Sequence, residues 1–308
     1  MTDSSSESWK LTLPCTKAEA ELIGAEIDLL VDLPEPPVLM AREPDPADPE
    51  NWLVEAYFEQ EPDPALIAAV KALIPSAANV APRIEKLDAA DWVTLSQAGL
   101  EPVAAGRFFV CTPAHAHEIP DGAVSFVIEA GRAFGTGQHE TTTGCLTMLD
   151  QLKQQGARFD NAIDVGTGTG LLAFAAQRLW PRAAVIASDI DPVAIEVAEE
   201  NAAANGFATG RTRGAIELVV APGLAHPRLK RRAPYDLVIA NILAGPLIEL
   251  APVLSSALAP GGSLILAGLL DHQADAVADA YRRRGLRLAH RIDRNEWPTL
   301  HLIKRHVR

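Results

Sequence analysis

The sequence predicts an α/β protein in which a large, mostly parallel sheet follows a smaller mixed unit. Three observations predict this arrangement. From residue 162 to residue 284, short apolar runs alternate with segments of helical periodicity, which is typical of strands covered by helices on both faces. Residues 286–305 hold two strand-like runs with no helix between them. The first 90 residues form a separate alternating pattern.

The N-terminal pattern predicts four strands and two helices. The expected strands are 9–14, 37–42, 52–60 and 79–87, and the expected helices are 16–30 and 63–74. Thr16 with Glu19 three residues later has the spacing of a capping box, and Pro64 suits a first helical turn. The order β-α-β-β-α-β is that of the ferredoxin-like domain. Many unrelated proteins use this order for binding, so it does not name a function.

The second pattern predicts a doubly wound sheet. The expected strands are 162–166, 183–190, 216–221, 235–241 and 262–269, with helices at 170–180, 192–205, 245–258 and 271–284. The runs 286–295 and 299–305 then predict a terminal hairpin, so one edge strand must run antiparallel. We therefore expect an N-terminal domain over 1–90, a linker over 91–105 and the larger domain over 106–308.

The charge of the chain is concentrated near its start. The formal net charge is −13, and residues 1–60 hold 14 acidic against 3 basic side chains. Such a surface repels nucleic acid and attracts a basic protein. An acidic surface that only aids solubility is the alternative that charge alone leaves open.

The sequence predicts a cytoplasmic protein. No apolar run approaches the roughly 18–20 residues of a membrane-spanning helix, and the first residues lack the basic and apolar regions of a secretory signal. Cys15, Cys111 and Cys145 have no close pair. This odd, scattered set favours neither disulfides nor a zinc site and indicates a reducing compartment.

A glycine-rich loop follows the first strand of the larger domain. In "IDVGTGTGLLAFAAQ" Gly166, Gly168 and Gly170 lie between a strand and a helix, the geometry that brings a nucleotide close to free backbone N–H groups. The dinucleotide fingerprint G-x-G-x-x-G requires glycine at 171, where the chain has leucine. The loop therefore predicts a nucleotide site of another type, and a plain tight turn is the alternative.

An acidic residue at the end of the next strand strengthens the nucleotide interpretation. Asp189 lies 23 residues after Gly166, where a carboxylate can accept hydrogen bonds from both ribose hydroxyls. Asp191 and Pro192 follow as a natural N-cap and first helical residue. Asp189 is therefore the better candidate for the ribose ligand.

Asn241 ends the fourth strand, at the edge where open α/β sheets bind their ligands. Its amide oxygen can accept a hydrogen bond from an amine and orient the amine's lone pair. The alternative is a polar cap at the end of a strand. In amino-group methyltransferases an asparagine or aspartate, two prolines and an aromatic residue occupy this position, and "NILA" resembles that motif only at the asparagine.

The doubly wound sheet with a terminal antiparallel hairpin resembles the seven-stranded, Rossmann-like fold of the methyltransferases that use S-adenosylmethionine (SAM). A closer resemblance lies in "AFGTGQHETTTGCL", "DVGTGTGLLAFAA", "DIDPVAIEVAEENAAANG", "ANILAGPLIELAPVL" and "GGSLILAGLL". These segments are similar to those of the methyltransferases that modify bacterial ribosomal protein L11. The resemblance is dense from about residue 106 to the C-terminus.

This resemblance implies a function and a site. The implied activity is SAM-dependent methylation of lysine ε-amines, and of an α-amine, of a large-subunit ribosomal protein, with the acidic N-terminal domain holding that basic substrate. Carried over residue by residue, Thr142, Gly166, Asp189 and Asn241 contact the cofactor, with Gly168 and Gly170 in the same loop and Asn241 as the catalytic residue. No metal, membrane or nucleic-acid partner is implied.

Other functions stay open at this stage. The chain could methylate a glutamine side chain, a nucleic acid or a small molecule, or be a non-catalytic module with a nucleotide-binding fold. His139 is a candidate general base, although a histidine in a glycine-rich loop more often orders the loop. The loop 130–146 itself has no lysine and no clear strand before it, so it is not a phosphate-binding P-loop. We interpret it as a lid or brace that carries Thr142 to the cofactor.

Overall fold

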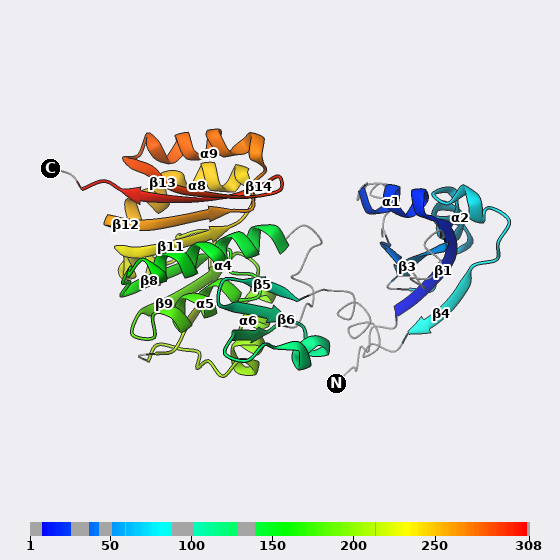
Figure 1. Cartoon of the computed structure of the whole chain (residues 1–308), viewed down its shortest axis with the longest axis horizontal. Coiled ribbons are helices and arrows are strands. Elements are labelled where there is room, and N and C mark those ends of the chain that lie inside the picture. The colour runs from blue at the N-terminus through cyan, green and yellow to red at the C-terminus, as the bar shows by residue number, and fades with distance from the viewer. Residues whose placement is uncertain are drawn as a thin grey trace. The chain divides into compact units, whose positions relative to one another are not determined.

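The computed structural model describes residues 8–25, 37–42, 51–58, 60–87, 102–128, 139–212 and 214–306. The chain divides into two compact units, residues 1–96 and 97–308 (Figure 1). The predicted boundary near residue 90 and most of the predicted linker lie outside the described residues. Each unit has its own hydrophobic core and is treated separately below.

The N-terminal unit is a four-stranded antiparallel sheet with helices on one face. Its elements are β1 (Ser8–Thr16), α1 (Lys17–Ala25), β2 (Val38–Arg42), β3 (Asn51–Phe58), α2 (Pro64–Ala72), a short 3₁₀ turn (Pro75–Ala77) and β4 (Arg83–Leu87). The strand order is β2-β3-β1-β4. Alternate residues of β1 and β3, such as Leu11, Leu13 and Val54, are fully buried and form the core with the helices, as the two-residue period of a strand requires.

The predicted capping box begins α1. The backbone N–H of Thr16 donates to Glu19 Oε2 at 2.8 Å, and the backbone N–H of Glu19 donates to Thr16 Oγ1 at 3.3 Å. Ser76 also donates to Glu19 through its backbone N–H and its hydroxyl. Burial raises the pKa of Glu19, but the hydrogen bonds from Ser76 and Thr16 outweigh it and lower the pKa to about 2. Glu19 thereby ties α1 to a segment 57 residues away.

The second unit contains the large sheet and its helices. The strands are β5 (Val103–Ala105), β6 (Phe108–Cys111), β7 (Val124–Val127), β8 (Asn161–Val165), β9 (Ala184–Asp189), β10 (Glu217–Val220), β11 (Tyr235–Asn241), β12 (Leu258–Ala267), β13 (Leu286–Arg294) and β14 (Trp297–Lys304). The helices are α4 (His139–Gln154), α5 (Leu171–Leu179), α6 (Pro192–Ala204), α7 (Pro227–Arg232), α8 (Ala244–Ala257) and α9 (Asp271–Arg282), and a 3₁₀ helix spans Pro113–Glu118.

Seven strands form one sheet in the order β10-β9-β8-β11-β12-β14-β13. The pairs among β10, β9, β8, β11 and β12 are parallel, whereas β14 is antiparallel to both β12 and β13. The predicted seven-stranded sheet with an antiparallel terminal hairpin is therefore confirmed. β14 inserts between β12 and β13, so the last strand of the sequence is not the last strand of the sheet.

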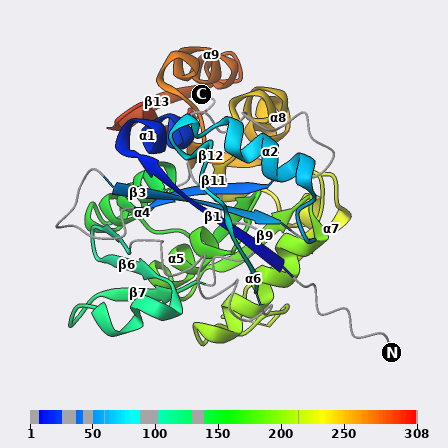
Figure 2. The same ribbon diagram turned by 90° about the vertical axis from the view of Figure 1, so that its right-hand side faces the viewer.

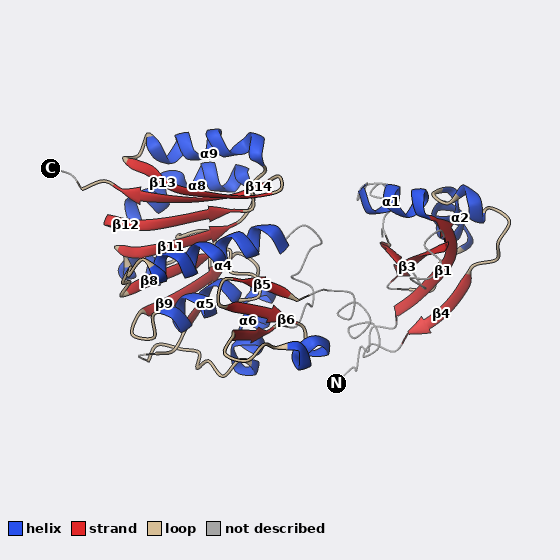
Figure 3. Cartoon of the chain, in the orientation of Figure 1, coloured by secondary structure: helices blue, strands red, loops and turns tan. Residues whose placement is uncertain are grey.

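Helices cover both faces of this sheet, as Figure 3 shows. One core cluster packs α4 and α5 against one face, and a second packs α8 and α9 against the other. Figure 2 shows α4 and α8 on opposite sides of the strands. Because both faces are buried, the inner strands are continuously apolar: Leu237, Val238, Ile239 and Ala240 of β11 are all fully buried.

A three-stranded sheet in the order β5-β6-β7 was not predicted from the sequence. The sequence interpretation assigned Val103–Ala105 to the linker, whereas these residues form β5 and pair with β6. Asn205, just after α6, ties this sheet to the larger domain. Its side chain accepts from the N–H of Val127 at 2.8 Å and donates to the carbonyl of Val127 at 2.7 Å.

In the described residues no helix is long and apolar enough to span a membrane. The three cysteines are all buried and carry free thiols. The predicted helices of the larger domain begin and end within two residues of the observed ones. Two helices of this domain, α4 and the six-residue, arginine-rich α7, were absent from the predicted ranges.

Candidate active site

The candidate site lies where the strand order of the large sheet reverses. The chain passes from β8 outward to β9 and β10, and then returns to β11 on the other side of β8. The connections after β8 and β11 therefore leave the sheet in opposite directions and open a crevice at the carboxyl ends of these strands. Gly166 follows β8, and Asn241 ends β11. The sequence thus brings these two predicted residues together through topology.

The glycine loop is fixed to the neighbouring strand by its own backbone. The N–H groups of Gly166 and Thr167 both donate to the carbonyl of Ser188, at 2.8 and 3.0 Å. The N–H of Gly170 closes the loop by donating to the carbonyl of Thr167 at 2.9 Å. The loop therefore has a defined shape in the protein alone, before a ligand contributes any contact.

Asp189 holds the centre of the loop from the end of β9. Its Oδ2 accepts from the N–H of Gly168 at 2.9 Å, and its Oδ1 accepts from the N–H of Asp191 at 3.1 Å. Asp191 caps α6, because its side chain accepts from the N–H of Val193. Each carboxylate oxygen of Asp189 keeps a free lone pair, so the group can still accept bonds from a diol.

A cavity of about 390 Å³ opens beside this loop. That volume is in the range of sites for small organic ligands. Three kinds of groups line it: the loop backbone, threonine hydroxyls and apolar side chains. The lining residues are Thr141, Thr142, Gly166, Thr167, Gly168, Thr169, Leu171, Leu172, Asn241, Ile242, Leu243, Gly268 and Trp297. Four of the six predicted site residues, Thr142, Gly166, Gly168 and Asn241, are among them.

Gly170 and Asp189 do not line this cavity. Asp189 accepts a hydrogen bond from the N–H of Gly168, which does line the cavity. Gly170 has a φ of +87°, and a Cβ at this position would collide with the ring of Phe174, one turn into α5. The structure therefore gives Gly170 a role in joining the loop to its helix, and our prediction of a cofactor contact at Gly170 has no support from the cavity.

Ile242 lies against residues on both sides of the crevice, Gly268 and Gly166. Its N–H donates to the carbonyl of Ala267 at 3.1 Å. Gly268 has a φ of +84°, and a Cβ there would lie 2.5 Å from the carbonyl oxygen of Ile242 and 2.9 Å from its nitrogen. On the other side, a Cβ on Gly166 would collide with the Ile242 side chain. The missing Cβ of Gly268 therefore makes room for the Ile242 backbone, and the missing Cβ of Gly166 makes room for the Ile242 side chain.

The threonines reach the cavity from the start of α4. Thr141 and Thr142 lie in its first turn and are buried, with 3% and 7% of their surface exposed. Their hydroxyls thus come from a helix that lies outside the glycine loop, as we predicted for Thr142. α4 begins at His139. Residues 130–138 of the proposed lid, and the His139 side chain, lie outside the described residues.

Trp297 and Leu243 are two cavity residues that the sequence interpretation did not assign to the site. Trp297 begins β14, some 130 residues after the glycine loop. Leu243 is 72% exposed although it is large and apolar. The sequence could have indicated Leu243, because it lies two residues after Asn241 in "NILA". Trp297 reaches the site only because β14 inserts beside β12.

Asp164 lies beneath the loop at 1% exposure. The hydroxyl of Thr167, which lines the cavity, donates to Asp164 Oδ2 at 2.6 Å. Burial is the largest influence and raises the pKa of Asp164; the bonds from Thr167 and the backbone of Ala173 lower it, and the charge of Asp189 raises it further. The resulting pKa is about 7. Asp164 is therefore a loop anchor whose charge depends on pH in the physiological range.

Comparison with known proteins gives the family. Residues 32–305 match the family model described as ribosomal protein L11 methyltransferase (PrmA). The chain belongs to this family. It is a methyltransferase.

Curated relatives carry the same description. A ribosomal protein L11 methyltransferase from Brucella suis is 47% identical over 218 residues, which cover 71% of this chain and 74% of that protein. One from Mesorhizobium japonicum is 41% identical over 288 residues, covering 93% of this chain and 96% of that protein. The likeness to the second relative therefore includes the N-terminal unit as well as the L11 methyltransferase catalytic domain.

A solved structure agrees with this placement. The ribosomal protein L11 methylase from Lactobacillus delbrueckii subsp. bulgaricus is 26% identical, with a TM-score of 0.57, over 67% of this chain and 99% of that chain. It supports the fold of the L11 methyltransferase family for this chain.

We expect Asp164→Asn to change how stability depends on pH. The unfolded carboxyl releases its proton near pH 4, whereas the folded one keeps it to about pH 7. Between these values the unfolded state binds fewer protons, so the free energy of unfolding of the wild type falls by up to about 1.4 kcal/mol per pH unit relative to the variant. Urea unfolding from pH 4 to pH 8 measures the difference, which should level off above about pH 7. Asp121→Asn, at an exposed turn, is the control. Parallel profiles for wild type and Asp164→Asn contradict the assignment.

Gly268→Ala should lower the free energy of unfolding of the catalytic unit by about 2–3 kcal/mol, because it combines an unfavourable φ with overlap on the Ile242 backbone. Gly285→Ala is the matched control: Gly285 has a similar φ of +88° but open space around the added Cβ. It should cost only about 1 kcal/mol. Chemical denaturation of both variants measures the difference, and equal losses would show that the Ile242 contact has no effect.

Proposed function

We propose that this chain transfers methyl groups from SAM to lysine ε-amines, and to an N-terminal α-amine, of ribosomal protein L11. The observation that carries this proposal is the pairing of a nucleotide-type loop with Asn241 across a single cavity, in a chain of the L11 methyltransferase family. The names of its relatives support L11 as the substrate. The choice of amine rests on the chemistry of the cavity.

The residues present fit SAM. The hydroxyl of Thr142 is a donor and acceptor for the amino-acid end of the molecule, and Asp189 retains lone pairs for the two ribose hydroxyls. Ile190 follows Asp189 and is 69% exposed, so it offers an apolar surface to a purine. SAM supplies a methyl group that is already activated by a positively charged sulfur.

The protein's task in this chemistry is to present a neutral amine in line with that methyl group. The amide oxygen of Asn241 accepts an N–H bond and thereby orients the nitrogen lone pair. With SAM bound, the amine nitrogen would take the methyl group as the bond from that carbon to sulfur breaks, and the electron pair of that bond would leave with S-adenosylhomocysteine. The amine's extra proton then leaves to water. We assign no general base, and His139 is proposed to order the loop at the start of α4.

Leu243 and Trp297 favour a lysine chain at the mouth of the cavity. Both are apolar, and both line the cavity with Asn241. Covering an exposed leucine with an aliphatic chain lowers the free energy, because apolar surface is removed from water. The same apolar contacts remove water from the amine, and desolvation lowers the pKa of a lysine. A more neutral amine is a better nucleophile, so these two side chains serve both binding and reactivity.

The N-terminal unit is proposed to hold the substrate protein. Its observed element order and strand order fit a ferredoxin-like domain, and residues 1–96 hold 19 acidic against 6 basic side chains. Such a unit attracts a basic protein over a distance of about the Debye length. We propose that the domain spans 1–90 and that residues 91–102 link it to the catalytic domain. A cytoplasmic location follows from the proposed substrate.

Asp189→Ala should weaken SAM binding by at least tenfold, because the ribose loses its acceptor and Gly168 loses its anchor. Isothermal titration calorimetry with SAM measures the affinity. Asp191→Ala is the matched control: it removes the N-cap of α6, lowers stability by about 1 kcal/mol, and leaves SAM affinity within twofold. If Asp189→Ala binds SAM normally, the ribose assignment is wrong.

The function itself is tested by methyl transfer from radiolabelled SAM to purified L11, with sites read by mass spectrometry. We expect label on lysine and N-terminal amines, and Asn241→Ala should lower kcat roughly 100-fold. Incubation with a ribosome-containing extract runs in parallel. Label on glutamine, RNA or a small molecule contradicts the substrate, and failure of the wild type to transfer any label contradicts catalysis.

A further inference from the structure

The net charge of the chain belongs entirely to one unit. Residues 1–96 carry a formal charge of −13, and residues 97–308 hold 21 acidic and 21 basic side chains. The catalytic unit is therefore neutral as a whole. Its charges, however, are not evenly spread over its surface, and the topology of the sheet shows where the cations gather.

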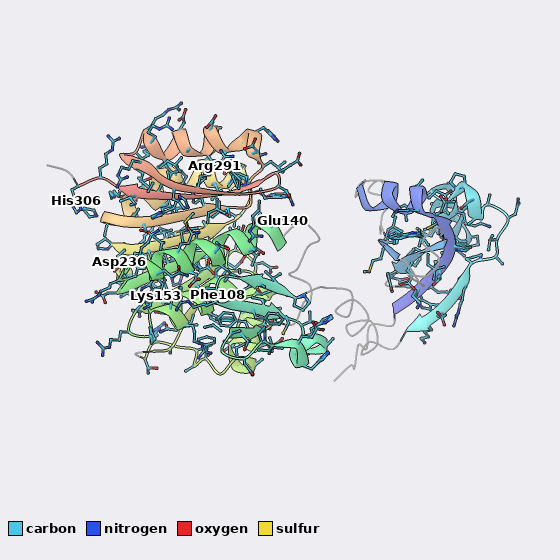
Figure 4. All side chains as sticks on the ribbon, viewed as in Figure 1. Phe108, Glu140, Lys153, Asp236, Arg291 and His306 are labelled. Carbon is cyan, nitrogen blue, oxygen red and sulfur yellow. The ribbon has the colours of Figure 1, made fainter. Side chains whose placement is uncertain are left out.

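The cations gather along the end of the large sheet at which its parallel strands begin, and not along an outermost strand. Every connection that enters β8, β9, β11 or β13 reaches this edge, and each carries arginine or lysine. We call this the basic edge, formed by Arg158, Arg182, Lys230, Arg231, Arg283 and Arg284. β14 runs antiparallel, so its last residue, Lys304, and the following Arg305 reach the same edge. Figure 4 shows Asp236 of β11 and His306 at this edge, and Glu140 at the opposite one.

The six side chains of the basic edge are exposed. In the part of the chain that the structure describes, no carboxylate pairs with any of them. The nearby arginines that do have partners behave differently: Arg228 and Arg232 pair with Glu217, and Arg282 pairs with Asp279. The edge also holds Asp236, which accepts the backbone N–H groups of Asp160 and Asn161, and the exposed Asp160. These two carboxylates are fewer than the free cations around them.

Helix dipoles explain only part of this excess. Helices α4 to α9 all end at this edge, and a cation in the last turn stabilises a helix C-terminus. Lys230 and Arg231 lie in the last turn of α7. Arg158 and Arg182 lie in the connections that enter β8 and β9, outside the helices, and Arg284 lies beyond the end of α9. Unpaired like charges also repel one another, so the approach of a polyanion lowers the electrostatic free energy of the edge.

We propose that the basic edge binds the phosphate backbone of a nucleic acid. The cations extend from β9 to β13, which at about 4.8 Å per strand spacing is about 24 Å. A row of this length fits a linear chain of evenly spaced charges better than it fits a compact acidic protein. Guanidinium groups also match phosphate geometry through paired N–H donors. Single-strand-binding folds cover about 4–16 nucleotides, which is compatible with this length.

The binding is independent of sequence and leaves the methyl-transfer site open. The edge carries cations rather than groups arranged to read bases, so phosphate contacts dominate. The SAM cavity lies at the opposite ends of the same strands. Our sequence-based expectation that nucleic acid is repelled therefore applies to the N-terminal unit, whereas the catalytic unit offers a separate surface. This proposal goes beyond the methyl-transfer function and does not require it.

Fluorescence anisotropy tests the proposal with the full chain and a labelled twelve-nucleotide oligouridine, titrated from 50 to 200 mM salt. Four neutralised phosphates predict a slope of about −3 for log K against log salt. Arg158→Glu combined with Arg182→Glu, at two exposed positions outside the helices, should weaken binding at least tenfold, with unchanged melting temperature and unchanged methyl transfer to L11. An unlabelled RNA hairpin should compete with the oligouridine, because it presents the same phosphate backbone whatever its sequence.

Arg294→Glu is the matched control, because Arg294 is also exposed but is the last residue of β13, at the other end of the sheet. It should leave affinity for the oligouridine within twofold. Polyglutamate of equal length is the second competitor. If polyglutamate competes as well as RNA, the surface is a docking site for acidic protein and the proposal is wrong. Equal loss in the edge and control variants, or affinity that does not depend on salt, also overturns it.

Discussion

The approach of the Ile242 backbone to Gly268 is the contact on which the site depends. Asn241 can face the glycine loop only if the chain turns immediately after β11, and that turn lies against the end of β12. A side chain at 268 would fill the space of the Ile242 backbone. The Ile242 side chain in turn fills the space that Gly166 leaves free. Loop, asparagine and sheet therefore have one consistent arrangement, and a shift in any one of them moves the other two.

The same crevice contains two carboxylates with opposite environments. Asp189 receives two backbone N–H bonds at the end of its strand. Asp164 is enclosed beneath the loop, where burial raises its pKa to about 7. The first can serve a ligand, whereas the second holds Thr167 and the loop above it. Two acids of similar sequence context thus differ in role because only one of them is shielded from water.

Sequence reasoning reached most of the fold because the strands and helices of the large sheet differ strongly in pattern. The inner strands are unbroken apolar runs, and the caps at Thr16 and Asp191 mark helix starts with local hydrogen bonds. The β5-β6-β7 sheet was missed because its strands are short, of three or four residues, and because the pairing of β6 with β7 is parallel and requires a long connection. α7 was missed because six residues are too few to show a helical period.

The site was predictable where position along a strand decides it. Gly166, Gly168 and Asn241 follow from the ends of β8 and β11, and these residues line one cavity. Gly170 looked like a further ligand contact, but only the structure shows that its missing Cβ makes room for Phe174. Trp297 depends on the pairing of β14 with β12, a contact between distant segments that no local pattern encodes.

The insertion of β14 between β12 and β13 also has a consequence for the order of assembly. β13 pairs with β14 and has no other neighbour in the sheet, so it cannot join the sheet until the strand after it has been made. During synthesis, β8 to β12 can pair with one another while β14 is still inside the ribosome. The wall that carries Trp297 is therefore the last part of the cavity to close, and the nascent protein completes its own site only after β14 has emerged.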